Sequence, residues 1–181
     1  MNASKIRGKI LQALWAAGKP MALQGIAEKA GLNSSSTTQY LSELIRAKYV
    51  SAPKEQYYAI TDRGKQALGL PKVDKKLALN ILTPVSVEKA FHFYYGLNQH
   101  AGVYADSLKD FVDKIQNLDV KSIEFHVPRK DFELWIRSLG DLELYKKMEL
   151  LRMKRLSGEN LRKELYETVN SRYEELKELT V

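Results

Sequence analysis

The sequence of 181 residues contains no cysteine, which excludes disulfide bonds, thiol catalysis and cysteine-ligated metal sites. It also lacks an apolar run of eighteen or more residues, so no segment is long enough to cross a membrane as a helix. The N-terminal apolar stretch is short and is not followed by the small-residue cleavage site of a signal peptide. These absences predict a cytoplasmic protein with no membrane partner.

Catalytic and metal-binding signatures are also missing. The three histidines, His92, His100 and His126, show no H-E-x-x-H or comparable ligand spacing. The chain has no phosphate-binding loop, no dinucleotide-binding glycine motif and no G-x-S-x-G nucleophile elbow. We therefore expect no metal, no cofactor and no enzymatic activity.

Positive charge is concentrated in one part of the chain. Residues 1–70 contain ten Lys and Arg against four Asp and Glu, a net charge of +6, whereas residues 71–181 have a net charge of +1. A local excess of this kind is typical of a domain that meets a polyanion, although it is also compatible with an ordinary soluble basic surface.

The first thirty residues predict two short helices. The stretch "SKIRGKILQALWAAGKP" repeats apolar residues at helical spacing from Ile6 to Ala17, with Ser4 as a candidate N-cap and Gly18 at its end. The stretch "MALQGIAEKAGLN" repeats the pattern, and Gly31 supplies the turn out of the second helix.

A third helix is predicted over residues 34–48, capped by Asn33 or Ser34. One face consists of Thr37, Leu41, Leu44, Ile45 and Lys48. The opposite face has short hydrogen-bonding side chains, at Ser35, Ser36, Thr38, Gln39 and Ser42. Two short helices joined at a glycine, the second with such a face, predict a helix-turn-helix whose second helix enters the major groove of DNA.

The next segment predicts a β-hairpin, or wing, over residues 49–60, followed by a short helix capped by Thr61 or Asp62. In this interpretation the polar face of the third helix reads base edges. The residues expected to hold DNA phosphates are Lys5, Arg7, Lys9, Ser34, Tyr40, Lys54, Arg63 and Lys65.

Residues 4–70 resemble the winged helix-turn-helix of transcriptional regulators of the MarR, PadR and ArsR kind. The resemblance lies in "IAEKAGLNSSSTTQYLSELIRAKYV" and in "YYAITDRGKQAL", with its Y-x-I-T-x-x-G ending of the wing. It implies binding of operator DNA by a homodimer, hence a protein associated with the nucleoid. The chain departs from the pattern at Lys48-Tyr49-Val50, where such proteins often have Gly-Leu-Val.

The second half predicts a linker over residues 71–84 and a mainly helical domain over residues 85–181. Residues 87–97 fit either a strand or a buried helix. Helices are expected over "SLKDFVDKIQNL", from Pro128 up to Gly140, from Asp141, and from Ser157 onward. From Val87 to Leu179 the chain resembles a small archaeal domain of unknown function, in "AFHFYYG", "GVYADSLKDFVDKI", "SIEFHVPRKDFELWIRSLGDLELYKKM" and "GENLRKELYETVNSRYEEL". The resemblance implies a separate domain and no particular chemistry.

Two groups of residues in this half are candidates for function. His126, Arg129, Asp131 and Trp135 could line a small-ligand pocket, or form a structural network at a helix start. The stripe of the last helix could pack within its own domain or pair with a second subunit. It consists of Leu161, Leu165, Val169, Tyr173 and Leu176.

The sequence as a whole predicts a mainly α protein with a small β wing: an N-terminal winged helix-turn-helix and a C-terminal helical domain, either α or α+β. The predicted function is sequence-specific binding of double-stranded DNA as a homodimeric transcriptional regulator. Two alternatives stay open. One is a winged-helix protein–protein adaptor, and the other is an enzyme or sensor of an unknown small-molecule effector in the C-terminal domain.

Overall fold

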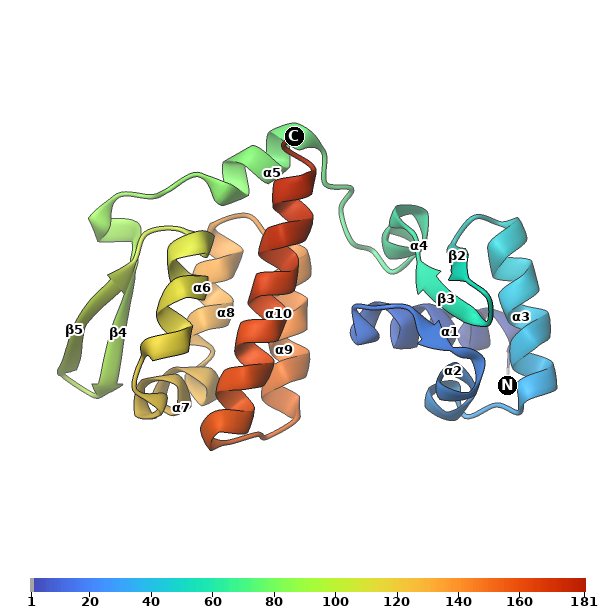
Figure 1. Cartoon of the computed structure of the whole chain (residues 1–181), viewed down its shortest axis with the longest axis horizontal. Coiled ribbons are helices and arrows are strands. Elements are labelled where there is room, and N and C mark those ends of the chain that lie inside the picture. Colours follow the sequence, from blue (N-terminus) through green and yellow to red (C-terminus); the bar gives the residue numbers. More distant parts are fainter. Residues whose placement is uncertain (1) are drawn as a thin grey trace. The chain divides into compact units, whose positions relative to one another are not determined.

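The computed structural model describes residues 2–181, and the chain divides into two compact units, Met1–Lys72 and Val73–Val181. We call them the N-terminal unit and the C-terminal unit. Each has its own hydrophobic core, and each is described by itself (Figure 1).

The N-terminal unit consists of three helices, a small sheet and a last short helix. Its elements are α1 (Ala3–Ala17), β1 (Met21–Ala22), α2 (Leu23–Ala30), α3 (Ser34–Arg46), β2 (Val50–Lys54), β3 (Tyr57–Ile60) and α4 (Asp62–Ala67). The sheet is antiparallel in the order β1-β3-β2, so the wing formed by β2 and β3 gains a third strand that the sequence did not reveal.

The helix ends of this unit follow from local capping. Gly31 has φ +68° and ends α2, and the N–H of Leu32 bonds the carbonyl of Ala27 at 2.9 Å. Asn33 then caps α3, because its side chain accepts from the N–H of Ser36 at 2.8 Å. The predicted cap of the first helix is wrong: Asn2, and not Ser4, is the N-cap of α1, and it accepts from the N–H of Ser4.

The third helix is shorter than its predicted range of 34–48. It ends at Arg46, and Lys48 has φ +62°, the left-handed conformation that favours glycine. This explains the departure from the Gly-Leu-Val pattern, because Lys48 adopts the backbone shape of the missing glycine. The N–H of Tyr49 then bonds the carbonyl of Leu44 at 2.9 Å, and the wing begins at Val50.

The C-terminal unit is an α+β arrangement in which one β-hairpin packs against several helices. Its elements are α5 (Lys75–Leu82), the 3-10 helix η1 (Val87–Lys89), β4 (Phe91–Gly96), β5 (Gln99–Ala105), α6 (Leu108–Asn117), α7 (Val120–Arg129), α8 (Asp131–Ser138), α9 (Leu142–Met153) and α10 (Gly158–Glu178). α10 packs against α5, α6, α7 and α9, and β4 packs against α7 (Figure 1).

Several expectations for this half change. The open choice at residues 87–97 resolves to a strand, β4, which pairs with β5. Pro128 does not open a helix: it lies in the last turn of α7, and α8 begins at Asp131. The segment 71–84 holds α5, whose Ala78 and Ile81 are buried in the core of the C-terminal unit.

The stripe of the last helix is buried within its own unit. Leu161 is 2% exposed, Leu165, Val169 and Leu176 are 0% exposed, and Tyr173 packs partly buried against the same core. The expectation that this stripe holds a dimer together is therefore wrong, and the alternative of intramolecular packing holds.

The largest fully buried side chain of the unit is a charged one, Arg172 on α10, which is 1% exposed. Its guanidinium forms two hydrogen bonds to the carboxylate of Asp141, from Nε at 2.8 Å and from Nη2 at 3.0 Å. Nη1 donates to Glu143 and to Glu175, both at 2.9 Å. Asp141 is also the N-cap of α9, so one ion-pair network ties α10 to the start of α9.

Replacing this arginine should destabilise the C-terminal unit strongly. Arg172→Met leaves the buried carboxylates of Asp141 and Glu143 without their partner, and breaking a buried pair in this way costs about 3–5 kcal/mol. Urea unfolding followed by circular dichroism measures the loss. Lys163→Met, on an exposed position of the same helix, is the control and should change the free energy of unfolding little. Equal effects of the two changes would contradict this role of Arg172.

Candidate nucleic-acid interface

The third helix, α3, turns its apolar face into the core and its polar face outward. Thr37, Leu41 and Leu44 are at most 2% exposed, and Thr37 donates its hydroxyl to the carbonyl of Asn33 at 2.8 Å. The exposed side chains on the other face are those of Ser34, Ser35, Thr38, Gln39, Ser42 and Arg46, and Ser36 is half-buried. The predicted base-reading residues therefore share one accessible face.

Two hydroxyl groups on this face already donate their protons to backbone carbonyls. Thr38 donates to the carbonyl of Ser34, and Ser42 donates to the carbonyl of Thr38, both at 2.9 Å. In this state they present lone pairs outward and accept hydrogen bonds, as from the amino groups of adenine or cytosine. Gln39 has no partner in the described part of the chain and keeps both a donor and an acceptor available.

The N-terminus of α3 is open to an anion. Its first turn has no acidic residue, and the Asn33 cap takes the N–H of Ser36. The N–H groups of the first turn and the helix dipole favour a phosphate at this end. Ser34 is exposed there, whereas Tyr40, another expected phosphate contact, is half-buried and packs against the core.

The only acidic residue of α3, Glu43, is neutralised from α1. Arg7 donates to its carboxylate from Nη2 at 2.6 Å and from Nε at 3.1 Å. Arg7 was expected to hold a phosphate, and here it pairs with Glu43 and joins α1 to α3. Lys5 and Lys9, its neighbours on α1, are exposed.

The wing is fastened to the end of α3 by the residues of the Y-x-I-T-x-x-G motif. Thr61 donates its hydroxyl to the carbonyl of Lys48 at 2.7 Å and accepts from the N–H of Gly64 at 3.1 Å, so it caps α4. A Cβ on Gly64 would lie 2.3 Å from the carbonyl oxygen of Tyr49, which leaves room only for glycine. The motif therefore fixes the wing relative to α3.

The basic side chains of the wing lie against aromatic rings. Lys54 lies 5.4 Å from the ring centroid of Tyr57, and the Arg63 guanidinium lies 5.3 Å from that of Tyr49. Both cations are exposed, so the rings position them without removing them from solvent. Lys65 is half-buried on α4.

Sequence reasoning missed one residue of this interface, Arg46. It is exposed and has no partner in the described part of the chain. Ser35, Gln39, Ser42 and Arg46 follow one another at i, i+4, i+7 and i+11, so extending the helical period by one turn would have found it.

The residues around His126 form a hydrogen-bond network, which is the structural alternative of the two that the sequence left open. His126 is 3% exposed, and its Nε2 accepts from the N–H of Tyr94 at 2.9 Å. Its Nδ1 therefore carries the proton and lies 2.7 Å from Asp131 Oδ2, which also accepts from Arg129 at 3.0 Å. Trp135 donates its indole N–H to the carbonyl of Lys89 at 3.1 Å. Each of these groups has a structural partner.

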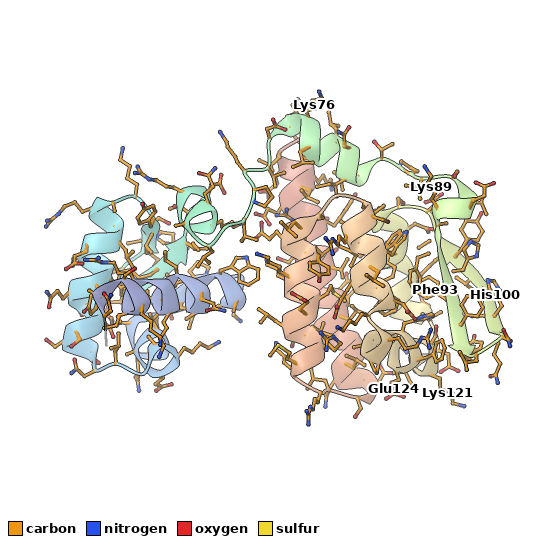
Figure 2. All side chains as sticks on the ribbon, turned by 180° about the vertical axis from the view of Figure 1, so that it is seen from behind. Lys76, Lys89, Phe93, His100, Lys121 and Glu124 are labelled. Carbon is orange, nitrogen blue, oxygen red and sulfur yellow. The ribbon has the colours of Figure 1, made fainter. Side chains whose placement is uncertain are left out.

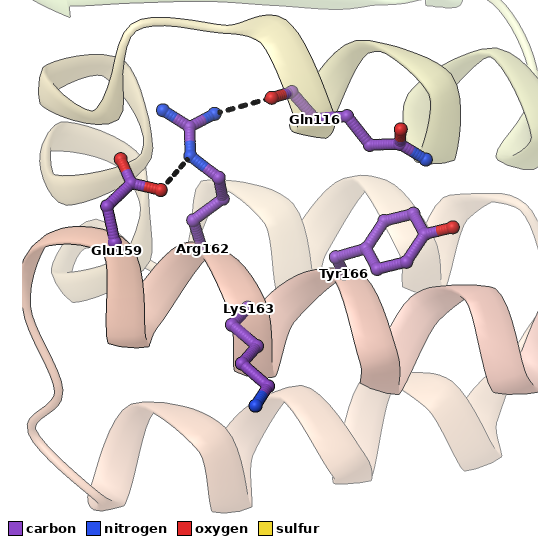
Figure 3. A pocket seen from close by; sticks show the side chains of 5 residues that line it. All are labelled: Gln116, Glu159, Arg162, Lys163 and Tyr166. Atoms are coloured by element: carbon purple, nitrogen blue, oxygen red, sulfur yellow. Dashed lines mark hydrogen bonds and ion pairs between the residues drawn. The ribbon is translucent and has the colours of Figure 1, made fainter.

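A hollow of about 300 Å³ lies elsewhere in the unit, along α10 and the end of α6 (Figure 3). It is lined by Gln116, Glu159, Arg162, Lys163 and Tyr166. Arg162 is committed to the end of α6, since its Nη1 donates to the carbonyl of Ile115 at 2.6 Å. Among residues 2–181 no group of three or more His, Asp or Glu side chains could hold a metal ion. No helix in that range is long and apolar enough to span a membrane.

Three helices, a wing after the third, and a polar outward face on that third helix define a winged helix-turn-helix domain of the DNA-binding class. Residues 8–53, from α1 into the first strand of the wing, match the family model of the IclR helix-turn-helix domain. No curated protein and no solved structure gives a significant match to the chain. The match confirms the predicted winged helix-turn-helix, although it is to the IclR domain and not to the MarR, PadR or ArsR kind. An IclR helix-turn-helix domain implies DNA-binding transcriptional regulation, and regulators with this domain are generally non-enzymatic.

The closed network around His126 has a pH dependence that can be measured. Burial lowers the pKa of His126 from its ordinary 6.5 and outweighs the hydrogen bond to Asp131, which raises it. The unfolded chain then takes up a proton near pH 6.5, where the folded chain does not. The contribution to stability is therefore full above pH 6.5 and is lost as the pH falls through the lowered pKa.

NMR titration of the His126 ring should accordingly give a midpoint below 6.5. The free energy of unfolding should fall as the pH drops from 6.5 toward this midpoint, and His126→Gln should weaken this pH dependence. A ring that titrates above 6.5 would show that the charge of Asp131 outweighs burial.

Proposed function

We propose that the chain is a sequence-specific regulator that binds double-stranded DNA, with α3 in the major groove and the wing on the phosphate backbone. The observation that carries the proposal is the outward face of α3, which combines short hydrogen-bonding side chains with an arginine and no free acid. Such side chains suit base edges, and the exposed cations of α1 and the wing suit phosphates. Binding to chromosomal DNA would make the protein nucleoid-associated.

The residues divide into two roles. Ser35, Thr38, Gln39, Ser42 and Arg46 read bases, with Ser36 half-buried beside them. Lys5, Lys9, Ser34, Lys54 and Arg63 hold phosphates. Arg7, which was also expected to hold a phosphate, bonds Glu43 and positions α3.

The adaptor alternative receives less support from the same surface. Among the described residues of the N-terminal unit, the exposed large apolar side chains are Ile45 and Tyr57, at 37% and 39%. One lies on α3 and the other in the wing, and two side chains are fewer than the contiguous apolar area of a protein-docking patch requires. The enzyme alternative receives no support from His126, because Asp131 and the N–H of Tyr94 occupy both of its ring nitrogens and leave none for a substrate.

A regulator of this kind reads DNA as a pair. One α3 covers a few base pairs, and two joined copies raise affinity through effective concentration. We therefore propose a homodimer that binds two half-sites about 10 base pairs apart, or a multiple of that distance.

Binding of the full chain to duplex DNA should weaken steeply with salt. The slope of log affinity against log salt is expected to be about −0.9 for each phosphate contacted. Lys54→Ala should weaken operator and random duplexes alike and reduce the slope by about one. Lys163→Ala, on the exposed side of α10, serves as the control and should leave the slope unchanged. The absence of duplex binding at low salt would refute the proposal.

Gln39→Ala should act on sequence preference instead. A preferred site selected from random duplexes would lose about 1–3 kcal/mol of binding free energy, because the amide makes up to two hydrogen bonds to one base. Binding to random duplex should change little. Gln12→Ala, an exposed glutamine on α1, is the matched control. If Gln39→Ala weakens all sequences equally, Gln39 does not read a base.

A further inference from the structure

The hairpin of the C-terminal unit is built from residues without charge. Residues 90–105 contain no Asp, Glu, Lys, Arg or Pro, in a chain of which 28% is charged. Exposed β-hairpins ordinarily carry charges or prolines, which prevent association with other chains. Their absence here indicates a surface that another molecule covers.

The two faces of the hairpin differ in their surroundings. Phe91 and Phe93 are at most 7% exposed and pack with Phe111 and Phe132 in the core. Because side chains alternate along a strand, the residues between them lie on the other face. Phe93 lies between the hairpin and the helices, whereas the exposed His100 lies at the outer margin of the unit (Figure 2).

Four aromatic rings form this outer hairpin face, those of His92, Tyr94, His100 and Tyr104. The His92 ring lies 5.6 Å from both His100 and Tyr104, and the Tyr94 ring lies 4.9 Å from His100. Leu97, in the turn of the hairpin, is 72% exposed and extends the surface. His100 and Tyr104 are exposed, and His92 and Tyr94 are half-buried. A contiguous group of exposed aromatic and apolar side chains marks an interaction site more often than single ones do.

The edges of the hairpin are not available for pairing with a further strand. On β4 the N–H of Tyr94 is taken by His126. On β5 a bulge at Gly102, with φ +74°, interrupts the strand, and its N–H donates to His100 Nδ1 at 2.8 Å. A bulge of this kind protects an edge from further strand pairing. The free surface is therefore the outer face.

We infer that the outer hairpin face binds the same face of a second copy of this chain. A surface without charge does not suit nucleic acid or an anionic membrane, since both are held by Lys and Arg. Across a two-fold axis each residue near the axis meets its own copy, so a lysine, arginine or carboxylate there would repel itself, whereas a tyrosine ring or Leu97 would not. Lys114, a cation that lies 5.3 Å from the ring of Tyr104, is paired with Asp110.

This inference rests on the proposed function, because a paired reading of DNA needs a dimer. It also provides the contact that the stripe of α10 cannot supply, since that stripe is buried. The hairpin face thus separates the two tasks of the chain: the basic N-terminal unit meets DNA, and an uncharged surface of the C-terminal unit joins the copies.

The absence of cysteine gives a direct test with the full chain. His100→Cys and Leu97→Cys each introduce a single thiol, so any disulfide must join two copies. Leu134→Cys is the control, an exposed leucine on α8 outside the hairpin. We expect fast oxidative crosslinking of at least one hairpin variant and slow crosslinking of the control. If neither hairpin variant crosslinks faster than Leu134→Cys, the inference is wrong.

Sedimentation of the chain without DNA gives the second measurement. The unchanged protein and Leu134→Asp should be dimers at micromolar concentration, and Leu97→Asp should be a monomer with an unchanged circular dichroism spectrum. A monomeric unchanged protein, or a Leu97→Asp dimer, would overturn the inference. Salt-dependent binding of monomeric Leu97→Asp to duplex DNA is measured separately, so the loss of the dimer and the failure of DNA binding remain distinguishable.

Discussion

The buried charge of Arg172 is the constraint on which the C-terminal unit depends. A guanidinium removed from water must be compensated by carboxylates with good geometry, and here Asp141 and Glu143 provide it from the start of α9. Because this contact fixes the rotation of α10 about its axis, the stripe from Leu161 to Leu176 must point into the same core. An apolar stripe at helical spacing therefore predicts that a helix is buried. It does not predict whether the helix packs within its own chain or against a second copy.

In the N-terminal unit, hydrogen bonds between uncharged groups that are close in the sequence position the third helix and the wing. Asn33 caps α3, Lys48 turns the chain out of it, and Thr61 closes the wing onto that turn. These bonds place the wing at a defined position beside the outward face of α3. The Arg7–Glu43 pair adds a link from α1 and neutralises the one acidic residue of α3.

The parts of the fold that sequence predicted well are those with local causes. The three helices of the N-terminal unit, the cap at Asn33, and the buried Phe132 and Ile136 follow from caps and from helical period. The strand β5 and the helix α7 were not predicted from the sequence. β5 is interrupted by a bulge at Gly102, and Pro128 fits a first helical turn as readily as a last one. The partners of Arg172 lie up to 31 residues away, a pairing that no local pattern encodes.

The polar outward face of α3 was predicted from residue types, because short hydrogen-bonding side chains recur there at helical spacing, whereas the contacts of single residues needed the structure. That this face binds DNA stays a prediction. Arg7 was expected to hold a phosphate by charge alone, and only the structure shows that it bonds Glu43. The hairpin, by contrast, contains no sequence motif that indicates an interaction surface. Its lack of Asp, Glu, Lys and Arg points to such a surface only once the structure shows that one face is buried and the other is exposed. The charge distribution then separates the surfaces: a polyanion is attracted to the N-terminal unit and finds no attraction at the hairpin. DNA binding and pairing of copies can therefore occur on one chain without competing for the same surface.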